Sequence, residues 1–268
     1  MTVTLQPLLL AFLLTVAVSG VHAQDVMPPP SQDKLASSID LSQPFGAKSG
    51  WRFMALQGPD TTEVGWTDPI PGKIRLCVTR DGGASCFPGL DHVLRLSSGD
   101  DWYSDPRYLI DVRIVHPRAD RPLLLMQVAS QHSVNGDQRL ATVVLAYDQA
   151  QESFTPVYEK QVNKNNNQEI RYLADGPLMG AIISAEPTND APFGFWIIVD
   201  RLGSTGGYKQ VLRYRSATRY DDHNPLAVID SEMPGILQRL GVWHPGMKLP
   251  LPASECAKPH LIGQELWC

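Results

Sequence analysis

The chain carries, directly after Pro122, the run Leu123-Leu124-Leu125-Met126-Gln127-Val128. Five of these six residues are apolar, so the run lacks the strict alternation of apolar and polar residues that a half-buried strand shows. A short apolar run of this kind is typical of a strand buried on both faces. The run therefore predicts a strand with neither face in water.

The segments around this run carry the alternating pattern of further strands. Apolar and polar residues alternate in 110–114, as expected of a strand with one buried face, and Val143, Leu145 and Tyr147 fall on one face of a further predicted strand. The polar segment 148–153 indicates a turn, and a strand pattern returns in 154–158. Because proline cannot donate a hydrogen bond within a sheet, Pro156 indicates an edge strand or a bulge.

Two more apolar strands are predicted over 178–185 and 193–199. The glycine-rich segment 203–207 turns the second of these into a strand over 208–220. Paired hairpins at this spacing predict an all-β fold, either a hairpin-rich sandwich or a partial β-propeller.

One short helix is predicted near the C-terminus. Ser231 can cap it, Pro234 falls in its first turn, and Gly241 can end it. Four apolar residues lie at i, i+3, i+4 and i+7 and form one stripe: Met233, Ile236, Leu237 and Leu240. We expect this stripe to pack on the sheet.

The N-terminus indicates export. Residues 8–18 form an apolar core that is short for a membrane span, and Val21-His22-Ala23 fits a cleavage site before Gln24. Neither Lys nor Arg precedes this core, and no cysteine lies near the cleavage point, so the lipid-attachment signal is absent. We expect a signal peptide over 1–23, a flexible leader over 24–50 and a single β-rich domain over 51–268. The mature protein is then extracytoplasmic, with no transmembrane segment.

The charge balance and the cysteines narrow the class further. A net charge of −5 argues against a nucleic-acid-binding protein, which would need a basic face. Cys77 and Cys86 flank the turn signal Asp81-Gly82-Gly83, and Cys256 can pair with Cys268 near the end of the chain. Two disulfides suit an oxidising compartment. Zinc binding is the alternative use of the four cysteines, but the sequence contains no C-x-x-C motif to support it.

The sequence carries no local catalytic motif. Its histidines lack metal-ligand spacing, 203–207 only resembles a nucleophile elbow, and a phosphate-binding loop is absent. We therefore predict no catalytic residue and no enzyme activity. Calcium is the one cofactor the sequence leaves open, because 135–137 and 221–224 are oxygen-rich turns, although ordinary polar turns explain them as well.

The candidate binding segment is Asn165-Asn166-Asn167-Gln168-Glu169-Ile170-Arg171-Tyr172. Asparagine is a poor former of helix and strand, yet strand patterns flank this run on both sides, as in a polar recognition loop. An ordinary solvated hairpin loop is the alternative. We predict partner contacts by Asn165, Asn166, Asn167, Gln168, Glu169, Arg171 and Tyr172.

The last residues of this segment can act in two ways. If a strand has begun by Gln168, Ile170 and Tyr172 share the core face and Arg171 is the anchor. If the loop persists to Arg171, Tyr172 is the contact. We favour Tyr172, since the asparagines suppress strand formation before it and aromatic residues dominate interfaces.

Four features together resemble one family: the export signal, the hairpin over 143–158, the run 165–172, and Leu226-Ala227-Val228-Ile229-Asp230-Ser231-Glu232-Met233-Pro234. The chain looks like the periplasmic immunity proteins of Xanthomonas-type bacteria, over about residues 75–243. This family protects its owner from peptidoglycan-hydrolysing effectors delivered by an antibacterial type IV secretion system. Family members are often lipoproteins, so the missing lipid-attachment cysteine is a departure.

The resemblance implies a periplasmic protein whose partner is a cognate secreted peptidoglycan hydrolase. It implies that a polar loop enters the active site of this lysozyme-like effector and inhibits it. Two alternatives from other classes stay open. The chain could be a stand-alone periplasmic module that binds carbohydrate or calcium, or a hydrolase with a dispersed catalytic site.

Overall fold

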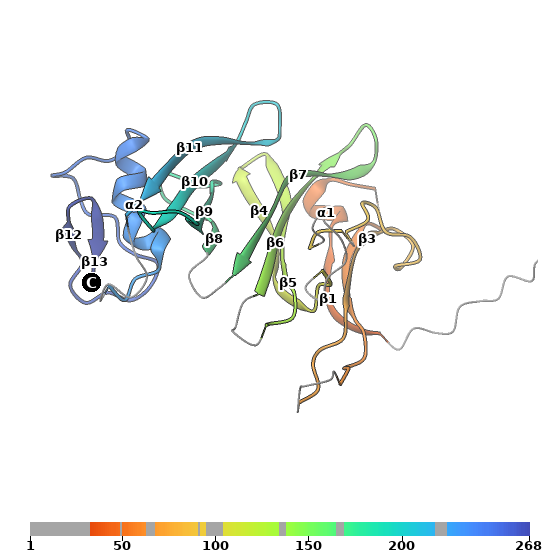
Figure 1. Ribbon diagram of the computed structural model, residues 1–268. Coiled ribbons are helices and arrows are strands. Elements are labelled where there is room, and N and C mark those ends of the chain that lie inside the picture. Colours follow the sequence, from red (N-terminus) through yellow and green to blue (C-terminus); the bar gives the residue numbers. More distant parts are fainter. Residues whose placement is uncertain are drawn as a thin grey trace, which may run out of the picture. The chain divides into compact units, whose positions relative to one another are not determined.

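The apolar run 123–128 lies in an inner strand of a four-stranded antiparallel sheet (Figure 1). The computed structural model describes residues 33–48, 50–62, 68–90, 92–94, 104–133, 138–164, 169–217 and 224–268, without the side chains of 163 and 164. The strands of this middle sheet follow the order of the chain: β4 (Tyr108–Arg118), β5 (Arg121–Ala129), β6 (Gln138–Asp148) and β7 (Ser153–Lys164).

Both faces of β5 are buried, as the sequence predicts. Leu124 and Met126 belong to a core cluster on one face of the middle sheet. Leu123 and Leu125 belong to a separate cluster on the other face. Gln127, the one polar residue of the run, donates a hydrogen bond to Thr142 Oγ1 at 3.0 Å. Its amide is thereby satisfied inside the sheet.

β7 is an edge strand of the middle sheet. Its pairing with β6 shifts register between Val144 and Leu145, where Tyr158 and Pro156 are the partners. Proline is tolerated at sheet edges and at bulges, and Pro156 occupies both kinds of position. This prediction from the sequence is confirmed.

A first sheet covers the Leu124 face of the middle sheet, because both sheets contribute to one core cluster. The sheet is antiparallel, and a short helix joins its first two strands. Its elements are β1 (Lys34–Asp40), α1 (Ser42–Phe45), β2 (Arg52–Gln57) and β3 (Ile74–Thr79).

The expected flexible leader over 24–50 is wrong for residues 33–48. β1 pairs with β2 along its length, and Leu41 and Phe45 are buried in the core. The polar composition of the segment concealed these few apolar residues, which suffice to fix it once a sheet lies beneath them. Residues 24–32 lie outside the described part of the chain.

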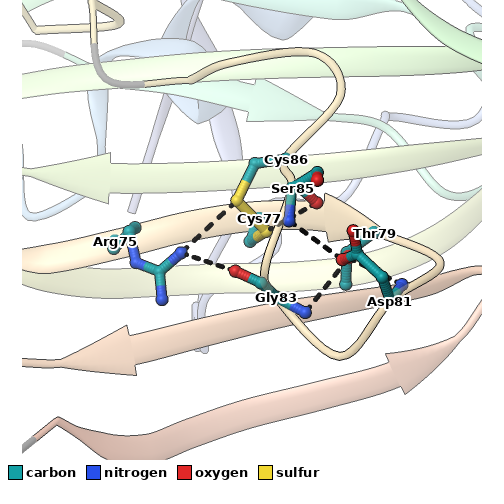
Figure 2. Close-up of a disulfide and its surroundings, with 7 residues drawn as sticks. All are labelled: Arg75, Cys77, Thr79, Asp81, Gly83, Ser85 and Cys86. Atoms are coloured by element: carbon teal, nitrogen blue, oxygen red, sulfur yellow. Dashed lines mark hydrogen bonds between the residues drawn. A yellow bond between two sulfur atoms is a disulfide. The ribbon is translucent and has the colours of Figure 1, made fainter. Parts of the chain in front are cut away.

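The Cys77–Cys86 disulfide closes the turn that follows β3, as predicted (Figure 2). Gly82 and Gly83 adopt positive φ angles of 72° and 97°, which side chains rarely allow. Thr79 Oγ1 and the backbone N–H of Ser85 both donate to Asp81 Oδ1, at 2.6 and 2.9 Å. Hydrogen bonds from Thr79 and Ser85 therefore hold the pKa of Asp81 well below its usual range.

A third sheet covers the opposite face of the middle sheet and shares a core cluster with it. It is antiparallel, in the spatial order β11-β10-β9-β8. The apolar segment 178–185 becomes a strand only from Ile182, because hydrogen-bonded turns occupy the residues before it. The strands are β8 (Glu169–Tyr172), β9 (Ile182–Pro187), β10 (Phe195–Leu202) and β11 (Tyr208–Ser216).

Helix α2 (Val228–Arg239) packs on the outer face of the third sheet, and Ile236 and Leu237 are buried there. Its start differs from the prediction. Ala227 is the N-cap, whereas Ser231 lies inside the helix and donates to the carbonyl of Leu266. Pro234 is consequently an interior residue and not part of the first turn.

The end of α2 and the C-terminal disulfide follow the predictions. Gly241 has a φ of 69° and donates to the carbonyl of Gln238, which ends the helix. Cys256 and Cys268 form the second disulfide. The last strands are β12 (His260–Ile262) and β13 (Glu265–Trp267), which form a small hairpin against α2.

The fold is therefore all-β, built from successive hairpin sheets with one short helix near the C-terminus, and it has no closed barrel in its described part. Helices of the length and apolarity needed to cross a membrane do not occur among the described residues.

Leu124→Ala and Leu125→Ala should each lower the free energy of unfolding by about 2–5 kcal/mol, because each removes a large buried side chain from a different core cluster. Urea unfolding measures the effect. Val211→Ala, at a residue that is 46% exposed, is the control and should change stability by no more than about 0.5 kcal/mol. A near-neutral result for either leucine would show that one face of β5 is not part of the core.

Candidate functional site

The candidate segment enters the third sheet at Glu169, where β8 begins. Side chains alternate along the strand, so Ile170 and Tyr172 face the middle sheet, and each is only 8% exposed. Glu169 and Arg171 lie on the opposite face, toward α2. This is the register in which Tyr172 is a core residue, so the preference for Tyr172 as a surface contact is wrong.

Arg171 is held by carboxylates on both sides. Its Nη1 and Nη2 donate to the two carboxylate oxygens of Asp230, at 2.7 and 3.3 Å. Arg171 Nη2 also donates to Glu169 Oε1. A guanidinium that binds a carboxylate with two nitrogens has a fixed orientation. Arg171 therefore connects β8 to α2 and is not a free anchor for a partner.

Glu169 caps helix α2 from outside the helix. Its Oε2 accepts a hydrogen bond from the backbone N–H of Ile229 at 2.9 Å, and the N-cap residue Ala227 provides no side-chain cap. A carboxylate at this place satisfies one of the free N–H groups of the first turn and complements the helix dipole. Burial raises the pKa of Glu169, against the opposing effects of Arg171 and the Ile229 N–H.

A pocket of about 530 Å³ opens beside this network, between the β8–β9 connection, α2 and the segment 250–253. Leu173, Leu178 and Met233 form apolar parts of its wall. Asp175 and Asp230 contribute carboxylates, and the adjoining Leu251 is 65% exposed. The pocket can hold an apolar side chain, and Arg171, which neutralises Asp230, lines it as well.

The four most polar residues of the candidate segment, Asn165, Asn166, Asn167 and Gln168, lie outside the described residues. Their flanks are fixed by pairing within two different sheets. Lys164 ends β7 and pairs with Gln138, while Glu169 begins β8 and pairs with Ala185. The segment therefore joins the middle sheet to the third sheet.

The two calcium candidates are mostly outside the described residues, which include neither 135–137 nor 221–223. Asn224 is described, and its Nδ2 donates to Ser231 Oγ and to the carbonyl of Leu266. Its side chain therefore links the start of α2 to β13. Within the described part of the chain, no three His, Cys, Asp or Glu residues are placed to hold a metal ion.

The sequence did not reveal a polar layer between the middle and third sheets. Lys160 Nζ donates to Ser184 Oγ at 2.8 Å and pairs with Glu186 at 2.7 Å. Some hydrolases use a serine with a lysine base. Ser184 is fully buried, however, and Lys160 is also held by its ion pair with Glu186, so these contacts join the two sheets.

A second polar contact lies in the same layer. Tyr158 donates to Asp200 Oδ2 at 3.3 Å, and burial raises the pKa of Asp200 against the opposing effects of Lys160 and Tyr158. The signal that could have found this layer is the position of Tyr158 and Lys160 on one face of β7.

Comparison of the chain with protein-family models, with curated proteins and with solved structures gives no match.

Arg171→Met should lower the free energy of unfolding by about 3–5 kcal/mol at neutral pH, because Glu169 and Asp230 would stay buried without their cation. Lys73→Met is the matched control, since its ion pair with Asp105 is exposed and is worth about 1 kcal/mol at most. Denaturant unfolding of both variants gives the comparison.

The loss in free energy of unfolding caused by Arg171→Met should be smaller at lower pH. The raised pKa of Glu169 means that the folded state binds this proton more tightly than the unfolded chain does. The contribution of Glu169 to stability therefore improves as pH falls from neutral through the raised pKa toward 4.5. Loss of Arg171 raises the pKa of Glu169 further, so the variant gains more stability over this range than the wild type does. A deficit that is constant between pH 7 and pH 5 would contradict this account.

Proposed function

We propose that the chain is a periplasmic immunity protein that binds and inhibits a peptidoglycan-degrading, lysozyme-like effector. Its cognate partner is a secreted hydrolase delivered by an antibacterial type IV secretion system. The polar segment 165–168 enters the active-site cleft of this partner. The family resemblance in the sequence motivates the proposal, and the following observations support it.

The observation that carries the proposal is the anchoring of the segment 165–168 at both ends. β7 before it and β8 after it are paired into two sheets that share a core cluster. Fixed ends reduce the conformational entropy that a loop loses when it binds. Asparagine and glutamine amides supply donors and acceptors suited to a polar cleft lined by carboxylates.

Glu169, Arg171 and Tyr172 act in this proposal as the base of the segment. Tyr172 packs in the core, and Arg171 ties β8 to Asp230 on α2. Glu169 adds the hydrogen bond to the N-terminus of α2. These contacts fix the position at which β8 begins, which is one of the two anchored ends of the segment.

The two disulfides support the compartment that the proposal requires. Cys77–Cys86 and Cys256–Cys268 use all four cysteines of the chain. Disulfides of this kind persist in oxidising compartments such as the bacterial periplasm. The N-terminal export pattern in 1–23 agrees with the same location.

The test is inhibition of cell-wall lysis by a purified secreted lysozyme-like effector encoded beside this protein. The wild-type chain should block lysis at a one-to-one ratio. A triple variant, Asn165→Ala, Asn166→Ala and Asn167→Ala, should weaken inhibition at least about thirtyfold, the effect of losing about 2 kcal/mol at an interface hot spot. Its melting temperature should stay unchanged.

Tyr172→Ala is the matched comparison and should lower both the melting temperature and inhibition, because Tyr172 is part of the core. Unaltered inhibition by the asparagine triple variant would place the interface elsewhere. If the wild-type chain does not protect cell walls and instead cleaves peptidoglycan, the hydrolase alternative replaces this proposal. Binding to carbohydrate or calcium without inhibition would favour a stand-alone binding module.

A further inference from the structure

A second site lies where the turns of neighbouring sheets meet. A hollow of about 670 Å³ opens between Arg121 at the start of β5, the β6–β7 turn and the β10–β11 turn. We propose that this hollow binds a small polar ligand that carries a carboxylate, with the guanidinium of Arg121 as its receptor. The inference is independent of the proposed function, since it uses other residues and another part of the fold.

The guanidinium of Arg121 is held against the β10–β11 turn. Its Nη2 donates to the carbonyl of Gly206 at 3.3 Å. Gly206 has a φ of 95°, and a Cβ at this residue would lie 2.1 Å from Arg121 Nη2. The turn therefore needs glycine for its backbone conformation and also leaves room for the guanidinium.

Arg121 brings a positive charge without a carboxylate partner among the residues that the structure describes. Asp148 lines the same hollow, but its Oδ1 accepts the backbone N–H groups of Ala150 and Gln151 at 2.8 and 3.1 Å. A guanidinium has five N–H donors, and the one described acceptor for Arg121 is the Gly206 carbonyl. The remaining donors match the paired oxygens of a carboxylate.

The size and walls of the hollow fit a small polar molecule. Its volume lies within the range of about 300–1,000 Å³ that is usual for ligand pockets. Thr155 and Thr205 line it and can hydrogen-bond a ligand. Tyr147 and Gln149 place an aromatic ring and an amide in the same hollow, and both also line, with Arg121 and Asp120, an adjoining hollow of about 150 Å³.

This arrangement differs from that of Arg171, whose guanidinium is taken up by Glu169 and Asp230. It also differs from that of Arg215, which pairs with Asp190. Arg121 combines a fixed, half-buried position with an unneutralised charge in a hollow. These properties point to an anion as the missing acceptor.

The experiment is a titration of the full-length mature protein followed by NMR, with two pairs of probes that differ only in the acidic group. D-glucuronate and D-glucose represent a sugar, and N-acetyl-glutamate amide and N-acetyl-glutamine amide represent a peptide. We expect saturable binding of at least one acidic probe, with its neutral counterpart at least about tenfold weaker. The acidic probe that binds identifies whether the carboxylate comes from a sugar or a peptide.

Arg121→Gln should weaken binding of the acidic probe at least about tenfold. Arg121→Lys should retain part of the affinity, because lysine keeps the positive charge but lacks the planar fork of donors. Arg118→Gln is the control, because Arg118 pairs with Arg121 across the β4–β5 turn but does not line the hollow. Melting temperatures show whether each variant is folded. The proposal is overturned if neither acidic probe binds, if the neutral probes bind equally well, or if Arg121→Gln and Arg118→Gln have equal effects.

Discussion

Burial of β5 and β6 on both faces is the constraint on which the rest of this structure depends. A sheet with two apolar faces needs a covering layer on each side. The first sheet covers one face and the third sheet covers the other, and each has its own core cluster with the middle sheet. The third sheet in turn leaves an apolar outer face, which α2 covers. The order of layers thus follows from the requirement to bury each apolar face in succession.

Polar contacts between the layers fix how they are joined. Gln127 lies in the apolar run of β5 and donates to Thr142, with a longer contact of 3.4 Å to the carbonyl of Ile170 in β8. Lys160 links β7 to β9 through Ser184, and Arg171 links β8 to α2 through Asp230. Buried polar groups cost free energy unless they are paired, so these contacts favour one arrangement of the layers over others. Arg171 is thus paired with a carboxylate inside the protein. Arg121, at the turns, donates to a backbone carbonyl and has no carboxylate partner among the described residues.

Short-range patterns made much of the fold predictable from the sequence. The apolar run in β5, the proline in β7 and both cysteine pairs depend on neighbours in the chain or in the same hairpin. The start of α2 was not predictable in this way, because Glu169, sixty positions earlier, accepts the N–H of Ile229. β1 was missed because its polar composition does not reveal the sheet that it joins. At the candidate site, the face on which Tyr172 lies depends on where β8 begins. A shift of one residue in a strand moves every side chain to the opposite face of the sheet.

Native-state hydrogen exchange tests the central role of the middle sheet most directly. Amides of β5 and β6 should exchange only when the whole domain unfolds, so their opening free energy should equal the global free energy of unfolding. Amides of the outer edge strands β1 and β11, and of the β12–β13 hairpin, should exchange through smaller openings. The account is contradicted if β5 and β6 open at lower free energy than the outer sheets, or if α2 with β12 and β13 forms the most protected part of the described chain.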